Sequence, residues 1–205
     1  GIGTFVIEAN GSYTFTPATD FNGSVPPVDY SVSDGNGGTV TATLDITVTP
    51  VNDAPTAYPK VYTVDEDAPL NGNLLADPGT TNQVDSDPDN DPLTVTDFTI
   101  GGQTYSAGAT ATLTGVGTLV VNADGTFTFT PAPDYNGTVP QATYTISDGN
   151  GGTSTASLAL TITPSNDAPS ATEDTASVTE DTPATGDVLP NDTDIDGDAL
   201  TVTQF

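Results

Sequence analysis

The chain has 205 residues and a formal charge of −27 at pH 7, because 28 acidic residues are opposed by Lys60 alone. This length suits one or two domains, and the charge repels nucleic acid and anionic membrane surfaces, which we therefore exclude as partners. The sequence contains no Cys, His or Met, which excludes disulfides and histidine-based catalysis and leaves zinc, copper and iron without their preferred ligands.

Alternating apolar and polar residues predict short β-strands along the whole chain. The first two, at 4–8 and 12–16, flank Asn10-Gly11, a dipeptide typical of a tight hairpin turn. In 39–49 every second residue is apolar and most of the others are Thr, as expected for a half-buried antiparallel strand. The same pattern predicts further strands at 28–33, 58–64, 93–100, 118–121, 126–130, 142–147 and 153–163. We find no capped helical pattern and no apolar run of transmembrane length, so we predict an all-β chain without membrane insertion.

Self-comparison shows an internal repeat. The segment 11–17 (GSYTFTP) returns as 125–131 (GTFTFTP), and Asn-Asp-Ala-Pro at 52–55 returns at 166–169, both after 114 residues. We therefore predict a complete unit at 51–164, preceded by the C-terminal part of a unit at 1–50 and followed by the N-terminal part of the next at 165–205. Such a chain is expected to be a window of a longer protein, which would complete both partial units; completion by a neighbouring chain is the second possibility.

Roughly seven short strands in a unit of this length are typical of a Greek-key β-sandwich, so the fold class predicted is all-β, with tandem sandwiches joined by short linkers. Two acidic loops, 107 residues apart, are the most unusual feature of these units. They place carboxylates at alternate positions: Asp85, Asp87, Asp89 and Asp91 in the first loop, and Asp192, Asp194, Asp196 and Asp198 in the second. The smaller offset means that the first copy carries seven extra residues, within 77–83.

These loops predict a metal. Two like charges about 4 Å apart repel by roughly 4 kcal/mol at an effective dielectric near 20, and the chain has almost no basic side chains to offset this. The missing positive charge must come from solution, and calcium, which takes six to eight oxygen ligands, is the natural cation. The acidic residues are 24 Asp and 4 Glu, and the preference for the shorter side chain favours coordination in tight loops. A solvated, salt-adapted acidic surface is the alternative.

Three other interpretations were weighed. The segment 192–197 matches the start of an EF-hand loop, but its twelfth position is Thr203 instead of Glu and a strand pattern follows. Paired carboxylates could serve a glycosidase, but they occur in every repeat without an aromatic sugar cleft, so we predict that the chain is not an enzyme. The loops beginning at Asp34 and Asp148 could be plain hairpin loops, since Asp and Asn fit such turns without a metal.

The order of these motifs resembles that of cadherin repeats, in the bacterial cadherin-like form found in giant secreted adhesins and biofilm proteins. The resemblance covers the complete unit and both partial ones. The family's base glutamate is similar to Glu66, its Asp-rich loop to 85–91 and its top aspartate before the last strand to Asp148. Its second acidic pair is similar to Asp134 and Asn136, and its linker to 166–169. Asn136 stands where cadherins often have a second acid, and the linker is shorter than usual.

The resemblance implies calcium between successive units, at two junctions. The junction near Pro164 would use Glu66, Asp67, Asp134, Asn136, Asn166, Asp167, Asp192, Asp194, Asp196 and Asp198. The junction near Pro50 would use Asp20, Asn22, Asn52, Asp53, Asp85, Asp87, Asp89, Asp91 and Asp148, with Asp34 as the counterpart of Asp148 in the preceding unit.

The function predicted is that of a calcium-rigidified extender of a large secreted bacterial surface protein, outside the cell. Its expected partners are neighbouring repeats of the same chain, with self-association as a possibility. One alternative is an adhesion module whose sandwich itself binds a sugar, a protein or another copy; the extra residues around 78–80 are the one repeat-specific insertion available for this. The other alternative is a spacer in a secreted enzyme.

Overall fold

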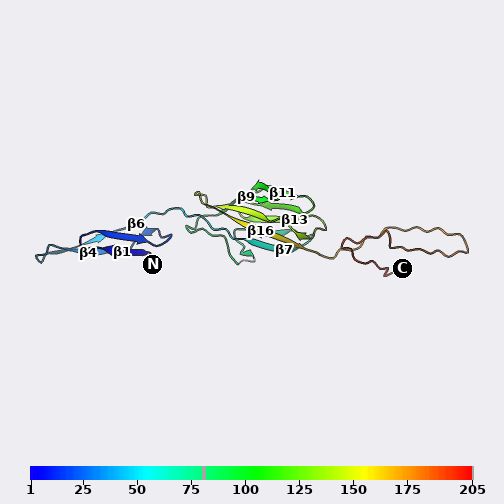
Figure 1. Cartoon of the computed structure of the whole chain (residues 1–205), viewed down its shortest axis with the longest axis horizontal. Helices are drawn as coiled ribbons and strands as arrows, with labels where there is room; N and C mark the ends of the chain where they lie inside the picture. The colour runs from blue at the N-terminus through cyan, green and yellow to red at the C-terminus, as the bar shows by residue number, and fades with distance from the viewer. Residues whose placement is uncertain (80–81, 205) are drawn as a thin grey trace.

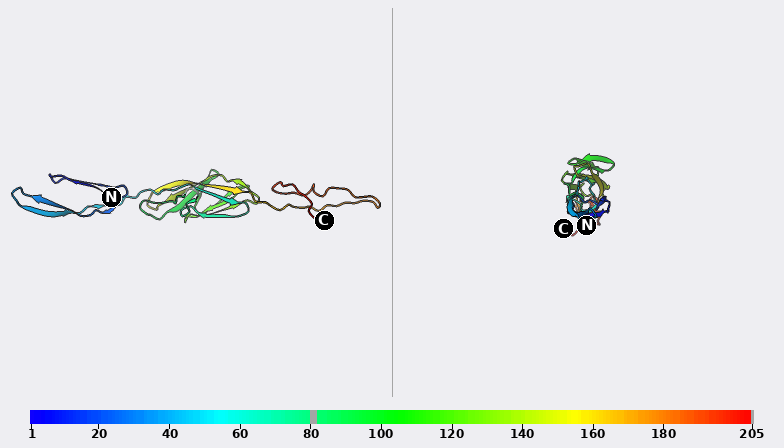
Figure 2. Two further views of the ribbon diagram at one scale, coloured as in Figure 1. Left: turned by 90° about the horizontal axis from the view of Figure 1, so that it is seen from below. Right: turned by 90° about the vertical axis from the view of Figure 1, so that its left-hand side faces the viewer.

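A computed structural model describes residues 1–79 and 82–204 of the chain. Three parts follow one another along one long axis: an N-terminal part, a central pair of packed sheets, and a C-terminal part (Figure 1). Figure 2 shows the same narrow rod from below and end-on. No α-helix occurs among the described residues, and the fold is all-β, as predicted.

The larger sheet of the central part contains six strands, and β7 joins it by pairing in parallel with β16. The other pairings are antiparallel, and the main path runs β10-β9-β15-β16-β14. In chain order the strands are β7 (Lys60–Asp65), β9 (Thr94–Ile100), β10 (Gln103–Ser106), β14 (Gly137–Thr138), β15 (Ala142–Ser147) and β16 (Thr153–Thr163). The parallel pair of β7 and β16 joins segments almost a hundred residues apart and places the start and the end of the unit side by side.

The second sheet of the central part packs its apolar face onto the first. Its strand order is β11-β12-β13-β8, all antiparallel. The strands are β8 (Leu70–Asn73), β11 (Thr110–Leu113), β12 (Gly117–Val121) and β13 (Thr126–Pro131). Strands β12 and β13 were predicted from the sequence, whereas β8, β10 and β11, each of only 4 residues, were too short to stand out.

Inward-facing residues of both sheets form one core. Phe127 and Phe129 of β13 are buried in one cluster with Phe98, Tyr144 and Leu158 of the larger sheet. The ring of Tyr62 meets that of Phe127 edge-on, with centroids 5.1 Å apart. Gly72 of β8 passes so close to the Phe127 ring that a Cβ there would lie 2.6 Å from a ring carbon, so this position requires glycine.

The N-terminal part repeats the second half of this sandwich without its first half. Strands β1 and β2 pair, as do β4 and β5, and β3 pairs with β6. The bounds are β1 (Gly3–Ile7), β2 (Tyr13–Pro17), β3 (Gly23–Ser24), β4 (Val28–Ser33), β5 (Thr39–Leu44) and β6 (Thr47–Val48). The single strand predicted at 39–49 is therefore two strands, interrupted at Asp45 and Ile46.

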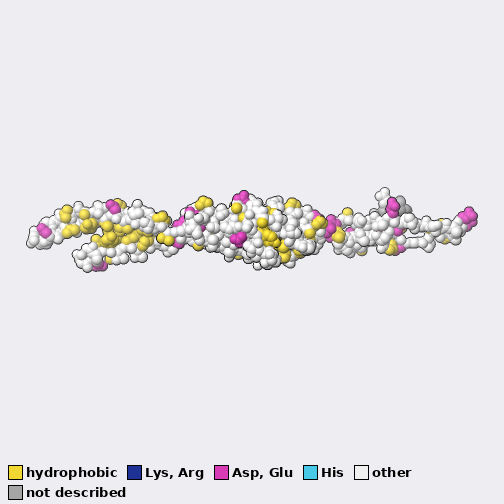
Figure 3. Space-filling view, turned by 90° about the horizontal axis from the view of Figure 1, so that it is seen from above, with side chains coloured by type: hydrophobic (Ala, Val, Ile, Leu, Met, Phe, Trp, Pro, Cys, Tyr) yellow, Lys and Arg dark blue, Asp and Glu magenta, His cyan; other side chains and the backbone are white. Residues whose placement is uncertain are grey.

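The apolar face of this part is uncovered. Tyr13 is 52% exposed and Val32 is 53% exposed, whereas their counterparts 114 residues later, Phe127 and Ile146, are buried. Apolar side chains accordingly gather on the N-terminal part of the surface (Figure 3). The strands that would cover them correspond to 60–113 of the central unit.

The C-terminal part, 165–204, contains no strand among its described residues, and its two long segments are joined by an isolated bridge between Ser170 and Thr193. The same bridge occurs in the central unit between Thr56 and Ser86. The extra residues within 77–83 lie between β8 and the first acidic loop, and Thr80 and Thr81 fall outside the described residues. No helix long and apolar enough to cross a membrane occurs in the described ranges.

Candidate metal centres at the junctions

The first acidic loop folds around the side chain of Asp87. Its Oδ1 accepts hydrogen bonds from the backbone N–H groups of Asp89, at 2.8 Å, and Asp91, at 3.2 Å. Asn90 completes the turn with a left-handed backbone, φ 63°, which Asn tolerates better than most residues. As a result, one carboxylate oxygen from each of Asp87, Asp89 and Asp91 lies within 4.8 Å of the others.

The second acidic loop has the same local geometry. Asp194 Oδ1 accepts from the backbone N–H groups of Asp196, at 3.0 Å, and Asp198, at 3.1 Å. Gly197 takes the left-handed position held by Asn90 in the first loop. The second aspartate of each loop thus specifies the turn, because Asp87 and Asp194 each accept from the backbone two and four residues on.

Each loop is tied to the linker that precedes it. The backbone N–H of Asp53 donates to Asp89 Oδ2 at 2.7 Å, and that of Asp167 donates to Asp196 Oδ2 at 2.7 Å. These bonds place the linker aspartates beside the loops, where the sequence resemblance implied them. Among the described residues, the side-chain amide of Asn166 donates only to the backbone carbonyl of Asp167, at 2.9 Å.

The base of the central unit contributes the other half of the junction near Pro164. Glu66, which is buried, accepts from the backbone N–H of Ser165 at 2.7 Å on Oε1 and from the amide of Asn136 at 3.3 Å on Oε2. The backbone N–H of Asp134 donates to Asp67 Oδ1 at 3.2 Å. The segments that follow strands β7, β13 and β16 therefore meet at this base.

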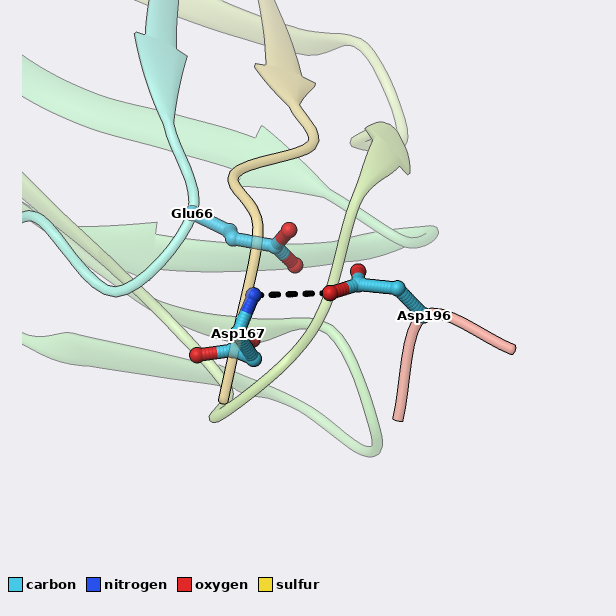
Figure 4. A group of neighbouring side chains, drawn as sticks. All are labelled: Glu66, Asp167 and Asp196. Atoms are coloured by element: carbon cyan, nitrogen blue, oxygen red, sulfur yellow. Dashed lines mark hydrogen bonds between the residues drawn. The ribbon is translucent and has the colours of Figure 1, made fainter. Parts of the chain in front are cut away.

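Two groups of three carboxylates form at this junction, and Asp167 belongs to both. Glu66, Asp167 and Asp196 make one group, and Asp67, Asp134 and Asp167 make the other, each with one oxygen per residue within 4.8 Å. Figure 4 shows Glu66 of the central unit and Asp196 of the next one approaching Asp167 of the linker from two sides. Carboxylates from two units and their linker thus converge on one point.

The electrostatic environment of the linker aspartates reflects this crowding. Desolvation raises the pKa of Asp167, and the negative charges of Asp67, Asp134, Asp196 and Glu66 raise it further. Desolvation likewise raises the pKa of Asp53, followed by the charges of Asp20, Asp89 and Asp87. Asp20 of the N-terminal part therefore faces the linker and the top of the central unit across the junction near Pro50.

The donor set fits a hard cation. Asp87 Oδ2 and Asp167 Oδ2 are buried and have no hydrogen-bond partner among the described residues. A buried carboxylate oxygen without a donor is costly, and a cation would satisfy it. Because the clustered ligands are all oxygens and no basic side chain lies among them, calcium suits them better than a metal that prefers nitrogen or sulfur.

Four of the residues expected at the Pro50 junction lie around its rim. Asn22 and Asn52 line an open hollow together with Asp89 and Asp91. Asn52 also donates to the buried Asp148 at 2.8 Å. This bond, more than the bonds from the loop's own backbone, lowers the pKa of Asp148. The loop at Asp148 therefore contacts the linker, and the role of Asp148 as a ligand stays a prediction.

Asp34, the counterpart of Asp148, has a different environment. Its carboxylate accepts from the backbone N–H groups of Asn36, at 2.8 Å, and Gly38, at 2.9 Å, and these bonds lower its pKa. No contact with another unit is described for it. Its role as a metal ligand, or as part of a plain hairpin loop, stays a prediction.

Asp85 and Asp192, the first aspartates of the two loops, do not join the clusters. Asp85 is buried and pairs with Lys60, whose Nζ lies 3.1 Å from Asp85 Oδ1. Asp192 accepts from the backbone N–H of Thr172 at 2.8 Å. The expectation that every loop carboxylate lacks a protein counter-charge therefore does not hold for Asp85, since Lys60 and the acidic loop are adjacent in space.

One contact at the junctions was not anticipated. Asn150 donates its side-chain amide to Asp91 Oδ2 at 2.7 Å, which joins the loop after β15 to the first acidic loop. The sequence held a signal for it, because Asn150 recurs as Asn36 within the repeated Asp-Gly-Asn-Gly-Gly motif. What the sequence could not show was that the side-chain amide of Asn150 reaches Asp91 of the acidic loop.

Comparison with known proteins identifies the class first. The bacterial cadherin-like domain matches residues 52–164, more than half of the chain. The chain therefore belongs to the bacterial cadherin-like domain family. The flanking parts match related descriptions, a cadherin-like domain at 1–49 and a bacterial Ig domain at 166–205.

Solved structures with a similar arrangement include the extracellular cadherin domains 1–5 of protocadherin gamma B2, at 16% identity and a TM-score of 0.49, covering 88% of this chain and 34% of that one. Protocadherin gamma B7 domains 1–4 match at 12% identity and a TM-score of 0.45, covering 90% and 45%. An endo-fucoidan hydrolase of glycoside hydrolase family 107 matches at 17% identity and a TM-score of 0.36, covering 80% and 22%. The chain thus spans less than half the length of each, and no curated protein matches it.

Proposed function

We propose that this chain is a stretch of calcium-rigidified extender repeats from a large secreted bacterial surface adhesin or biofilm matrix protein. The observation that carries the proposal is the position of Asp167. It lies in the linker, belongs to two carboxylate groups at once, and meets Glu66 of one unit and Asp196 of the next. A cation held there would join two units and their linker by the same set of bonds.

The proposed ligands at this junction are the clustered carboxylates and the amide of Asn136. Calcium would supply the positive charge that the described residues near the clusters lack, and it would be held by Glu66, Asp67, Asp134, Asp167 and Asp196. At the Pro50 junction the corresponding ligands are Asp87, Asp89 and Asp91, with Asp20 and Asp53 on the facing side. Sites of the extracellular class bind calcium at roughly 10⁻⁴ to 10⁻³ M, so such junctions would be loose inside a cell and stiff outside it.

The mechanical role follows from electrostatics. Without calcium, the carboxylates repel one another and favour separation of the units. With calcium, the same carboxylates become ligands, so each junction adopts one fixed arrangement. The rod-like succession of parts in Figure 1 and the match of three successive segments to cadherin-like and Ig domains support this role. The proposed partners are neighbouring repeats of the same chain, on the outside of the cell.

The test is a calcium titration of the 205-residue chain, followed by calorimetry and small-angle X-ray scattering, with magnesium as the control. A site at ten times its dissociation constant adds about 1.4 kcal/mol of stability, so the thermal midpoint should rise and the maximum dimension should become better defined. Magnesium, which demands a tighter octahedral site, should do neither at the same concentration. Unchanged dimensions in calcium would refute the proposal, whether or not the midpoint rises.

A further inference from the structure

The only basic side chain of the protein is in its interior. Lys60, the first residue of β7, is fully buried, and so is the side chain of its partner Asp85. The ammonium also donates to the carbonyl of Gln83 at 2.9 Å. Asp85 is further held by the Tyr144 hydroxyl, 3.0 Å from Oδ2, and by the backbone N–H of Tyr58, 2.8 Å from Oδ1. Every one of these contacts is with a group of the central unit itself.

This pair connects the core to the acidic loop. Asp85 begins that loop, and the next residue, Ser86, bridges the segment before β7 through Thr56. A buried carboxylate is tolerated only with a counter-charge or strong hydrogen bonds. Without Lys60, Asp85 would be a desolvated negative charge directly beside three more carboxylates.

The following unit offers an internal comparison. Its Asp192 accepts the same backbone bond, from Thr172 at 2.8 Å, and Thr193 makes the same bridge as Ser86. The repeat offset of 114 residues, however, places Asp174 where the central unit has Lys60. The two units therefore share the backbone bonds around Asp85 and Asp192, but the position of Lys60 differs between them by two units of charge, because it is Asp174 in the following unit.

We propose that the Lys60 ammonium is the built-in cation of the central unit, which neutralises Asp85 from within and lets the unit fold without calcium. This inference deepens the proposed function: it separates folding of the unit, which Lys60 secures, from stiffening of the junctions, which calcium secures. At low calcium the chain would then contain a folded central unit between loose junctions. In the following unit Asp174 stands at this position, so no cation is supplied from it.

The test compares the wild-type chain with Lys60→Met and with the double variant Lys60→Met/Asp85→Asn, all in excess chelator. Methionine keeps the length and apolar stem of the side chain but removes its charge. The wild type should unfold in one cooperative calorimetric transition of the central unit. Breaking a buried pair from one side should lower the midpoint by roughly 10 to 20 °C, and the double variant, which leaves no unpaired charge, should recover at least half of that loss.

Each outcome decides the inference. If Lys60→Met does not fold, recovery of the β-sheet circular dichroism signal by the double variant supports it, and failure to recover refutes it. A Lys60→Met midpoint within a few degrees of the wild type would also overturn it, as would a wild type that is unfolded in chelator. Scattering dimensions in calcium are measured on the same samples. If calcium leaves the scattering dimensions unchanged, the proposed function is refuted. The inference about Lys60 is not affected by that result, because the Lys60 comparison is made entirely without the metal.

Discussion

Replacement of Asp87 by Asn probes the first cluster with little disturbance of its loop. The carboxylate uses Oδ1 for two backbone hydrogen bonds, whereas Oδ2 is buried without a partner. In Asp87→Asn an amide oxygen can keep the two bonds, but an NH₂ group takes the place of the free oxygen. A donor aimed into the cluster cannot bind a cation, so the loop should persist while calcium affinity falls.

The size of the effect follows from Coulomb's law. A divalent ion and one carboxylate oxygen about 2.4 Å apart attract by roughly 3 kcal/mol even at the dielectric constant of bulk water. Allowing for the water that replaces the lost ligand, calcium should bind roughly 10- to 100-fold more weakly at this junction. Calcium at ten times the original dissociation constant would then give about 0.1 to 0.4 kcal/mol of stabilisation instead of about 1.4 kcal/mol.

Isothermal titration calorimetry with calcium, on the wild type and Asp87→Asn, measures this directly. The matched control is Asp97→Asn, which also removes one charge from the central unit. Asp97 accepts from the Thr145 hydroxyl at 2.9 Å on the face of the larger sheet and belongs to none of the three carboxylate groups. If all three proteins give superimposable isotherms, Asp87 is not a ligand and the reasoning from its unpartnered oxygen is wrong.

Three further results are expected. Gly72→Ala should destabilise the central unit by about 1–3 kcal/mol in denaturant melts, because its Cβ would overlap the Phe127 ring. The control Gly186→Ala should leave the melt unchanged, because nothing lies within 4 Å of the added Cβ. Equal effects of the two substitutions would contradict the packing described. Burial raises the pKa of Tyr62 to about 12, so the folded unit retains a proton that the unfolded chain loses near pH 10. The free energy of unfolding should therefore fall as the pH rises through 10 towards 12, and its slope against pH should be smaller in Tyr62→Phe. Identical slopes for the two proteins would refute the assignment. Trypsin, which has Lys60 as its single site, should cleave only above the thermal transition of the central unit, and rapid cleavage at 25 °C would show that this side chain is not buried.

Much of the architecture could be predicted from local pattern. The repeat offset and the strict alternation of apolar residues indicated tandem β-sandwiches, and the alternate aspartates indicated loops that gather carboxylates. The alternation and the spacing of the aspartates can be read within a few neighbouring residues, and the repeat can be read from segments that recur along the chain. Strand β8, in contrast, contains Asn71, Gly72 and Asn73, which favour turns, and it becomes a strand only because β13 lies beside it.

The candidate site was predictable to the extent that its residues depend on local geometry. Asp87 and Asp194 bond their own loops, so the spacing alone indicated the turns that they form, whereas their role as ligands stays a prediction. Asp85 follows the same spacing, yet its partner Lys60 comes from a strand 25 residues earlier in the sequence. Asp148 likewise meets Asn52 of the linker, 96 residues earlier in the sequence, a contact that the motif around Asp148 does not indicate. Such differences arise from contacts between distant segments, which a pattern within one segment cannot express.

The most direct test of the central claim is the length distribution of the 205-residue chain by small-angle X-ray scattering, in 5 to 10 mM calcium (on the order of ten times the weakest extracellular-class dissociation constant) and in chelator. The account predicts a single extended rod in calcium and a shorter, broader distribution in chelator, reversible on re-addition of calcium and absent for magnesium. Identical distributions in calcium and chelator would contradict it, because the carboxylates at the junctions would then hold no ion that fixes one unit against the next.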